Sequence, residues 1–425
     1  MRRFHSLALS VSRMLRGTLV GGLLGGGLLG GGLLGGLVGL AGCERAVSYP
    51  AGLSWGDPAL PTYTSQQRLA VSCNGDDTLG FVSESAPDTP QLLGAAAVGN
   101  SPVEIEGPHH LTSSSDGRFI FFNLSNYVTN GGSGPHGAHG TGTVPGYLVK
   151  LDARTGRPLG QVLVDRSPGD VIRSHDDRLI FVSHYDLARL SDALTRGLPS
   201  EQGYSSVAII DAASMELLSM TPVCPTAHGM GLSPDGQRLY VTCSLSDELA
   251  VLDVRDPQKP QVTARVHVGP QPGQLGNPAY APYALAVDAG GLVWISDNKS
   301  GDVRVFDPAT MQPDPTRVVK VGGVAMFADF STDGQWLYVP HQGDDHVSAI
   351  HTKTLELREL ALPKEACLAA HALRVLSPQT AAVVCEGDHL SRKGTVVMLD
   401  LAAWTVRGFV EVGLFPDGMT RLPAL

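Results

Sequence analysis

The chain of 425 residues has no excess of basic side chains, because 31 Lys and Arg stand against 41 Asp and Glu. It therefore lacks the positive surface that phosphate backbones require, and we expect no nucleic-acid partner. None of the six cysteines stands in a Cys-x-x-Cys-His sequence, which excludes covalent c-type haem. A phosphate-binding Gly-rich loop and a His-Glu-x-x-His zinc motif are also absent, and we name no catalytic residue from the sequence.

The first 43 residues are typical of a bacterial lipoprotein signal. An apolar Gly/Leu run starts near Thr18 and ends in Leu40-Ala41-Gly42-Cys43. Four arginines lie before it, namely Arg2, Arg3, Arg13 and Arg16. Small residues before a cysteine give a signal peptidase access to the backbone, after which the thiol takes the lipid, with palmitate among the acyl chains. A transmembrane helix is the alternative, because residues 18–42 are long enough to cross a bilayer. The position of Cys43 directly after the small residues favours lipidation.

We therefore expect residues 1–42 to be removed, residues 43–66 to form a lipidated, flexible tether, and residues 67–425 to fold. Loss of the four leader arginines leaves 27 basic residues against 41 acidic ones, a formal charge of −14. The protein is expected in the cell envelope as a lipid-anchored monomer. Glu44, where an aspartate would retain a lipoprotein at the inner membrane, favours the outer membrane, with the protein facing the periplasm or the surface.

Short strand patterns separated by Asp-Gly turns recur from about residue 107 to the end of the chain, whereas long helical periodicity is absent. The clearest copy runs from Ala227 to Cys243, with third and fourth strands at Glu248–Asp253 and Gln261–Val268. Asp-Gly between alternating apolar residues is a strong hairpin signal. Further copies contain Leu111–Phe122, Val171–Val182, Ala284–Ser296, Met326–Val339 and His371–Val384. Four strands per unit, recurring about every 45 to 60 residues, predict an all-β fold, a propeller of four-stranded antiparallel blades.

The two ends of the chain complete the count of blades. Arg68–Cys73 has the pattern of a second strand without a first, and Pro416–Leu422 has that of a first strand without a second. Pairing of these segments makes one composite blade and leaves no open sheet edge. Together with the six internal units, it predicts a seven-bladed β-propeller whose ring is closed by the C-terminal strand.

Two segments carry a resemblance to a known family. Leu239-Tyr240-Val241-Thr242 and Leu337-Tyr338-Val339-Pro340, each after an Asp-Gly turn, resemble the YVTN-type seven-bladed propellers of bacterial and archaeal surface and periplasmic proteins. The resemblance covers nearly all of residues 68–422 and implies the fold and the compartment. It implies no particular reaction, since the family includes lactonase-like enzymes, haem- or quinone-associated dehydrogenase subunits and adhesion modules.

The first strand of each propeller blade lines the central channel, so residues that begin these strands can converge on one mouth. Alignment of the blades places there His109, Gly169 or Asp170, His228, Tyr283, Met326, His371 and Asp417. Imidazoles with a carboxylate suit a transition metal or general acid–base chemistry, and the candidate metal ligands are His109, His228, His371 and Asp417. The alternative is that these histidines only bond to neighbouring blades.

Further histidines are expected on the same face. They are His110, His184 and His341, together with His136 and His139 of the Gly-rich insertion Asn130–Gly146. Such an insertion cannot bury a core of its own, so it is expected to be a lid over the channel or a surface loop.

The cysteine spacing predicts two disulfides. Cys224 and Cys367 each lie four residues before a channel-mouth histidine, and Cys243 and Cys385 each end the next strand of the same blade. In an oxidising compartment we expect the bonds Cys224–Cys243 and Cys367–Cys385, each closing a loop of about 19 residues and contributing roughly 3 kcal/mol. Zinc binding by the Cys-x-x-x-His segments is the alternative.

The remaining cysteine, Cys73, matches Cys243 and Cys385 in position, but Gly413 stands where its partner would be. We expect a free, buried thiol.

Two hypotheses of function follow. In the first, the protein is a binding module that holds a protein, glycan or small ligand on its histidine-rich top face. In the second, it is a metal- or cofactor-dependent enzyme, oxidoreductase- or lactonase-like, or an electron-transfer accessory protein that uses the channel mouth. We favour the first because the regularity of the sequence serves architecture, and a transition metal is the cofactor that the candidate ligands suggest.

Overall fold

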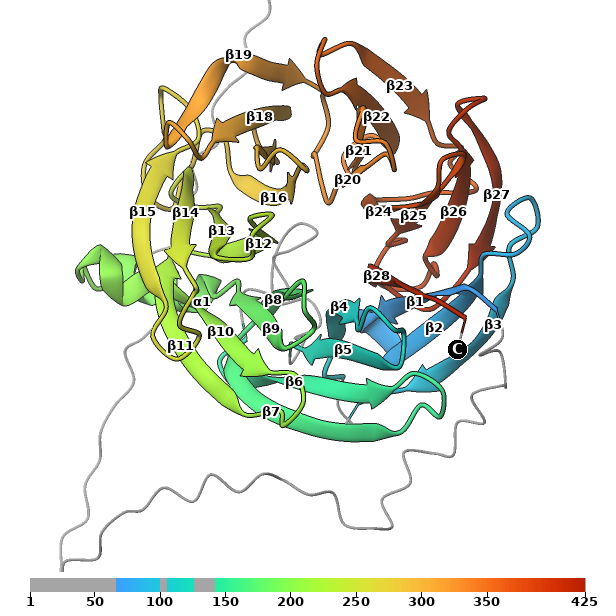
Figure 1. Ribbon diagram of the computed structural model, residues 1–425, viewed down its shortest axis with the longest axis horizontal. Helices are drawn as coiled ribbons and strands as arrows, with labels where there is room; N and C mark the ends of the chain where they lie inside the picture. The colour runs from blue at the N-terminus through green and yellow to red at the C-terminus, as the bar shows by residue number, and fades with distance from the viewer. Residues whose placement is uncertain (1–65, 100–104, 126–141, 425) are drawn as a thin grey trace, which may run out of the picture. The chain divides into compact units, whose positions relative to one another are not determined.

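The computed structural model describes residues 66–99, 105–125 and 142–424, which form a ring of seven sheets around a central axis (Figure 1). Each sheet is a blade of four antiparallel strands. The all-β, seven-bladed fold predicted from the sequence is confirmed. In the described part of the chain, no helix is both long enough and apolar enough to cross a membrane.

The first three blades follow one another around the ring. From the axis outwards they consist of β28 (Pro416–Leu422), β1 (Arg68–Cys73), β2 (Thr78–Ser83) and β3 (Leu92–Ala97); β4 (Pro108–Ser113), β5 (Phe119–Leu124), β6 (Pro145–Asp152) and β7 (Pro158–Arg166); and β8 (Pro168–Arg173), β9 (Leu179–His184), β10 (Ser205–Asp211) and β11 (Leu217–Cys224). Short helices interrupt two of the connections, namely η2 (Asn74–Asp76), α1 (Leu187–Thr195) and η4 (Ser200–Gly203).

The other four blades have the same order. They consist of β12 (Ala227–Leu232), β13 (Arg238–Cys243), β14 (Glu248–Asp253) and β15 (Gln261–His267); β16 (Pro282–Val287), β17 (Val293–Asp297), β18 (Asp302–Asp307) and β19 (Gln312–Lys320); β20 (Asp329–Phe330), β21 (Trp336–His341), β22 (His346–His351) and β23 (Leu357–Ala361); and β24 (Ala370–Ser377), β25 (Thr380–Cys385), β26 (Thr395–Asp400) and β27 (Thr405–Glu411).

The Asp-Gly turns join first to second strands because glycine adopts a positive φ without a steric cost. Gly117, Gly236 and Gly334 have φ values of 70°, 69° and 67°. The N–H of each glycine donates to the carbonyl of the serine three residues before it. In the third blade Asp177 takes this position, at φ 61°, which explains why that repeat is recognisable without a glycine.

Apolar side chains pack blade against blade between the sheets. Phe121 of β5, for example, belongs to one buried cluster with Ile180 of β9 and Ala208 of β10. Full burial of a large apolar side chain contributes about 1.5–3 kcal/mol. The outermost strands differ, since β15 alternates exposed and half-buried residues along its length. The core of the ring therefore lies in its inner and middle strands, which hold the channel residues in fixed positions.

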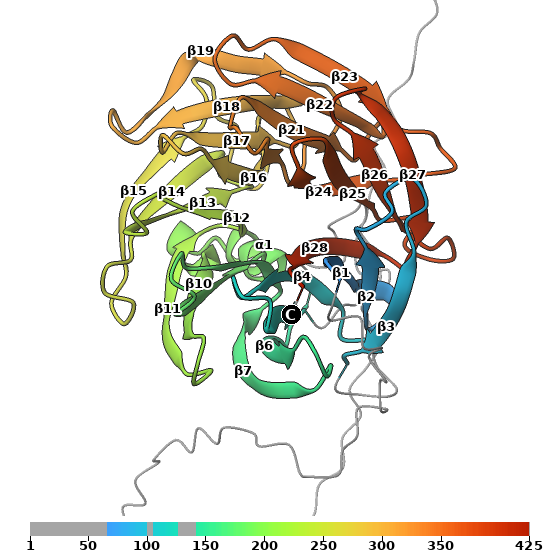
Figure 2. The same ribbon diagram turned by 45° about the vertical axis from the view of Figure 1, so that its right-hand side comes forward.

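The ring is closed by the last strand of the chain. Residues of β28 pair antiparallel with β1, with Arg421 opposite Leu69 and Met419 opposite Val71, and Figure 2 shows the two strands side by side. The Arg421 side chain also pairs with Glu84, the residue after β2, at 2.9 Å between Nη2 and Oε2. The composite blade predicted from the two chain ends is confirmed.

Several predictions fall on residues outside those described. These are lipidation at Cys43, the signal and tether up to residue 65, and the insertion as far as residue 141, which includes His136 and His139. They stay predictions. The predicted end of the insertion at Gly146 is wrong, because Pro145 and Gly146 belong to β6.

Candidate metal centre

Histidines and a carboxylate from four inner strands meet where those strands begin. His109 and His110 lie on β4, His228 on β12, His371 on β24 and Asp417 on β28. At each of these places the pairing register with the neighbouring strand shifts. A β-bulge re-aims side chains, so the local irregularity that interrupts pairing also turns these groups toward one another.

The Asp417 carboxylate lies at the middle of this cluster. Its Oδ2 is 2.7 Å from Nε2 of His109, and its Oδ1 is 2.6 Å from Nε2 of His371. Nε2 of His110 is 3.6 Å from Oδ1, and the Asn74 amide donates to Oδ2 at 3.3 Å. Three imidazoles therefore point the same ring nitrogen at one carboxylate.

The other ring nitrogen, Nδ1, of each of these histidines is held by a protein acceptor. The pairs are His371 with Glu386 (2.5 Å), His110 with Asp170 (3.0 Å) and His109 with the carbonyl of Pro168 (3.3 Å). With a proton on Nδ1 held in this way, each ring can release its Nε2 proton and offer that nitrogen to an ion. Metal-binding histidines in proteins nearly always have such a second partner, which fixes the tautomer and the orientation of the ring.

Aromatic side chains close the remaining side of the cluster. The Tyr283 hydroxyl is 2.9 Å from Nε2 of His228, and the two rings stack with centroids 4.0 Å apart. Phe327 stacks on His371 at 5.4 Å and meets the His110 ring edge to face at 4.5 Å. All of these rings are buried, so aromatic side chains line one side of the polar cluster.

Burial and ion pairing act in opposite directions on the charges of the cluster. Burial alone would lower the pKa of His371, but Asp417 and Glu386 outweigh it and raise that pKa to about 10. Burial prevails at His109, whose pKa is lowered. Burial would raise the pKa of Asp417, yet the surrounding imidazoles hold it well below its usual range. Asp417 is therefore an anion paired with protonated His371, and an ion bound there would take the place of the His371 Nε2 proton.

Two overlapping sets of donor atoms are close enough to share an ion. The donor atoms of His109, His110 and His228 all lie within 4.8 Å of one another, and so do those of His110, His371 and Asp417. Two donors at 2.0–2.1 Å from a tetrahedral ion are about 3.3 Å apart. The 3.6 Å between His110 and Asp417 matches that spacing, while the shorter contacts of Asp417 must widen by about 0.6 Å. Imidazole and carboxylate donors together suit zinc, copper or iron.

The four candidate ligands predicted from the sequence, His109, His228, His371 and Asp417, all reach the cluster, and whether they hold a metal stays a prediction. Three further channel-mouth residues also lie there. Tyr283 and Asp170 bond to cluster histidines, and Met326 belongs to the apolar group that includes Tyr283 and Phe327.

Two of the expected histidines are bonded away from the cluster, within their own blade or to the neighbouring one. His184 Nδ1 is 2.9 Å from the Ser206 carbonyl, and its Nε2 accepts the Asp165 backbone N–H at 3.1 Å. Both ring nitrogens of His341 are likewise bonded within the sixth blade and its preceding loop. His184 and His341 are therefore structural histidines, in agreement with the alternative given for the histidines of this face.

Sequence reasoning left His110 out of the ligand set and did not find Glu386. Strand alternation places His110 opposite to His109, but the bulge brings the two ring centroids to 4.5 Å. Glu386 bridges His371 and His389, each at 2.5 Å. The signal that could have found it is its place next to Cys385, whose disulfide partner lies four residues before His371.

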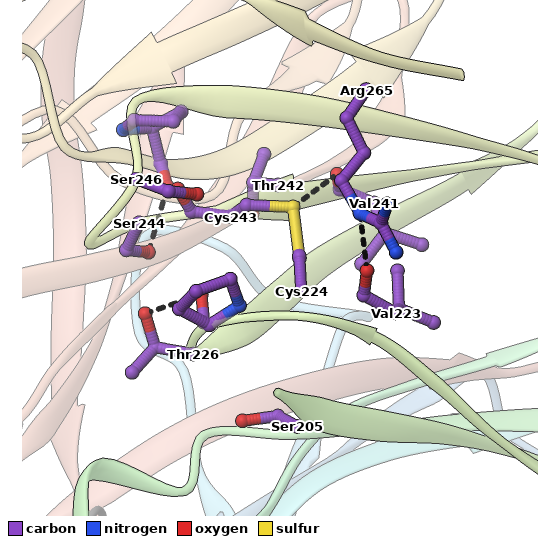
Figure 3. The surroundings of a disulfide bond; sticks show 12 residues. Ser205, Val223, Cys224, Thr226, Val241, Thr242, Cys243, Ser244, Ser246 and Arg265 are labelled. Carbon is purple, nitrogen blue, oxygen red and sulfur yellow. Dashed lines mark hydrogen bonds between the residues drawn. A yellow bond between two sulfur atoms is a disulfide. The ribbon is translucent and has the colours of Figure 1, made fainter. Parts of the chain in front are cut away.

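Both predicted disulfides are present, Cys224–Cys243 and Cys367–Cys385. Figure 3 shows the first of them, beside which the Arg265 guanidinium donates to the Val223 carbonyl at 2.6 Å. Cys73 is free and buried as predicted. An added Cβ on Gly413 would lie 2.7 Å from both Cβ and Sγ of Cys73, so glycine leaves room for the free thiol at the place where the other two blades have a cysteine. Each existing bridge fixes the loop that precedes a histidine-bearing strand.

A family model described as "SMP-30/Gluconolactonase/LRE-like region" matches residues 195–316, less than half of the chain. The matched segment contains β12 and β16, which carry His228 and Tyr283. No match was found among curated protein sequences.

Solved structures with a similar fold cover most of the chain. The periplasmic gluconolactonase of Pseudomonas aeruginosa is 20% identical, with a TM-score of 0.62 over 85% of this chain and 100% of its own. Hydrazine synthase of Kuenenia stuttgartiensis is 17% identical, with a TM-score of 0.56 over 77% and 93%. Virginiamycin B lyase from Staphylococcus aureus is 11% identical, with a TM-score of 0.51 over 75% and 90%. At such identities the likeness concerns the fold, and the chain is a seven-bladed β-propeller similar to enzymes of several different chemistries.

Proposed function

We propose that the protein is a lactonase-like hydrolase that depends on a metal ion held around Asp417. One observation carries the proposal: three Nε2 atoms, each on a ring whose Nδ1 is anchored, converge on one buried carboxylate. The match of residues 195–316 to a gluconolactonase-like region and the likeness to a periplasmic gluconolactonase support lactone chemistry. Within the propeller fold, the YVTN-type relationship suggested by the sequence is part of this proposal.

The residues of the centre divide the work between them. A divalent ion held by His110, His371 and Asp417 supplies polarisation of the lactone carbonyl when bound. Asp170 and Glu386 keep the Nδ1 protons on their histidines and leave the Nε2 lone pairs for the ion. The imidazoles are buried beside aromatic rings, so charges in the cluster are screened less than in solution.

The burial of the imidazoles favours a bound ion over a docking surface made of histidines. His109, His228 and His371 have no exposed surface, so a protein or glycan does not contact them directly. An ion is the partner that such a buried cluster of imidazole and carboxylate donors suits.

Export and lipid attachment at Cys43 form a separate part of the proposal. Two buried disulfides support an oxidising compartment, because such bonds are rare in the reducing cytosol. We propose a monomer, anchored by lipid in the outer membrane, that binds no nucleic acid.

The test uses the full-length protein, extracted in detergent without chelator, and a panel of five- and six-membered lactones that includes gluconolactone. We expect hydrolysis that chelator abolishes and added zinc restores. His371→Ala and Asp417→Asn should lose the metal and about 100-fold or more of the activity. His346→Ala is the matched control, because His346 lies partly exposed on β22 and is expected to leave both unchanged.

Two results would overturn the proposal. Metal-loaded protein that hydrolyses none of the lactones is not a lactonase. Hydrolysis that persists after complete removal of metal shows that the centre acts without an ion.

A further inference from the structure

We infer that His389 is a positioning residue of the metal centre, which holds His371 and Asp417 in place from the loop between β25 and β26. The inference rests on the metal centre of the proposed function and adds to it a residue that acts through its neighbours. Two links carry it, one through a carboxylate and one through an aromatic ring.

The first link joins His389 to His371 through Glu386. Nε2 of His389 donates to Oε2 of Glu386 at 2.5 Å, and Oε1 of the same carboxylate lies 2.5 Å from Nδ1 of His371. Glu386 has no exposed surface, and these two imidazoles are its side-chain partners in the described part of the chain. Without His389 the carboxylate is held from one side only, so the orientation that it gives to the His371 ring is weakened.

The second link joins His389 to Asp417 through Phe415. The imidazole stacks on the Phe415 ring, with centroids 3.7 Å apart and planes 15° from parallel. Phe415 is fully buried and directly precedes β28, two residues before Asp417. Its carbonyl accepts the backbone N–H of Asn74 at 2.9 Å, and the Asn74 side chain donates to Asp417. The stack therefore fixes the segment that leads into the strand carrying the central carboxylate.

The loop that carries His389 is itself fixed. The Asp388 carboxylate accepts three successive backbone N–H groups at 2.7–2.9 Å, those of Leu390, Ser391 and Arg392. It also accepts the Ser391 hydroxyl at 2.8 Å. A side chain can orient others only when its own position is determined, and these bonds supply that condition.

His389 is the member of this network that solvent reaches. Its side chain is 22% exposed, whereas those of Glu386 and His371 have no exposed surface. It lines a cavity of about 300 Å³ between the sixth and seventh blades, together with Gln342 and Asp388. The ring can therefore be replaced without removing a metal ligand or opening the core, which makes the role of the residue testable.

Three substitutions separate the two links. His389→Phe keeps a ring that can stack on Phe415 and removes the donor to Glu386, whereas His389→Gln keeps a donor and removes the ring. The φ of His389 is 63°, a conformation that glycine adopts without strain, so His389→Gly removes both links with little risk to the fold. His346→Ala is the control, because His346 is also a partly exposed histidine of a loop-to-strand junction.

The first measurement is the zinc affinity of the full-length proteins, by competition with a chromophoric chelator. Loss of an outer partner of a metal-binding histidine weakens binding by about 10–100-fold, so we expect a dissociation constant about 10-fold higher in His389→Phe and up to about 100-fold higher in His389→Gly. His389→Gln should lie between wild type and His389→Gly, and His346→Ala should equal wild type. His389→Phe combined with Glu386→Gln should cost no more than Glu386→Gln alone, because the donor acts through that carboxylate.

The second measurement needs no metal. A proton shared between an imidazole nitrogen and a carboxylate gives a strongly downfield proton resonance, so metal-free wild-type protein should show one that His371→Ala removes. In His389→Phe this resonance should shift, because Glu386 has lost its other partner. A melting temperature that falls while the resonance and the zinc affinity stay unchanged shows a residue that only stabilises its loop, and overturns the inference.

Lactone hydrolysis enters neither measurement, so the two proposals can fail separately. Protein with the expected order of zinc affinities that hydrolyses no lactone refutes the lactonase and leaves the role of His389 intact. Metal-dependent hydrolysis together with an unchanged zinc affinity in His389→Gly does the reverse.

Discussion

Removal of the two disulfides tests how the blades that carry the histidines are stabilised. The double variants are Cys224→Ala/Cys243→Ala and Cys367→Ala/Cys385→Ala. All four side chains are buried, with at most 1% of their surface exposed, and alanine keeps the Cβ atom in each case. The two variants are therefore matched in burial and in the atoms removed, and each serves as the control for the other.

The loop lengths set the expected cost. The bonded cysteines are 19 and 18 residues apart in sequence. In the chain-entropy description a loop of this length contributes about 3 kcal/mol, and one residue more or less changes that by under about 0.1 kcal/mol. Both variants should lose about 3 kcal/mol of the free energy of unfolding. For a propeller of about 360 residues, this corresponds to a melting temperature lower by about 4 °C.

Equilibrium unfolding in urea, followed by tryptophan fluorescence, gives the two free energies, and calorimetry gives the two melting temperatures. A loss of less than about 1 kcal/mol in either variant would show that loop closure does not stabilise the blade. Losses that differ by more than about 2 kcal/mol would show that local strain, and not loop length, decides the effect.

Three further predictions follow from other residues. Burial lowers the pKa of His184 to about 4, against the raising effect of Asp165, so unfolding takes up a proton between pH 6.5 and 4. Stability should therefore fall by up to about 3 kcal/mol as pH drops through this window, and His184→Gln should remove that share of the slope in urea titrations. Gly413→Ala should destabilise the protein, because the added Cβ would lie 2.7 Å from both Cβ and Sγ of the buried Cys73 and 2.8 Å from an Asp76 oxygen; an unchanged melting temperature would contradict this. Wild-type protein should partition into the detergent phase of Triton X-114 and carry acyl groups on Cys43, whereas Cys43→Ser should stay in the aqueous phase.

The ring was predictable because its signals are local. Each Asp-Gly turn between apolar alternations marks one hairpin, and Gly117, Gly236 and Gly334 adopt the positive φ that makes this so. The pairing of Leu69 with Arg421 was predictable for a different reason: two incomplete blades at the chain ends have only each other as partners. Neither step needs knowledge of side-chain packing.

The site was predictable only as far as strand register holds. Residues that begin inner strands share one end of the channel, which identified His109, His228, His371 and Asp417. The alternation rule then fails at the bulge on β4, where consecutive residues His109 and His110 turn toward the same carboxylate. A bulge depends on packing against neighbouring blades, so the alternation of apolar and polar residues in the sequence does not predict it.

Closure of the ring and assembly of the cluster are one event, because the same strand does both. β28 supplies Asp417, and the next residue, Gly418, donates its N–H to Ser72 of β1 at 3.0 Å while Ser72 bonds to the His109 carbonyl. A Cβ on Gly418 would lie 3.1 Å from that carbonyl, so a side chain there would push β28 and β4 apart by a few tenths of an ångström. The strand that carries the anion is thus the strand that joins the first blade to the second. An ion bound there is bound by the closed ring alone, and its binding free energy must add to the stability of closure.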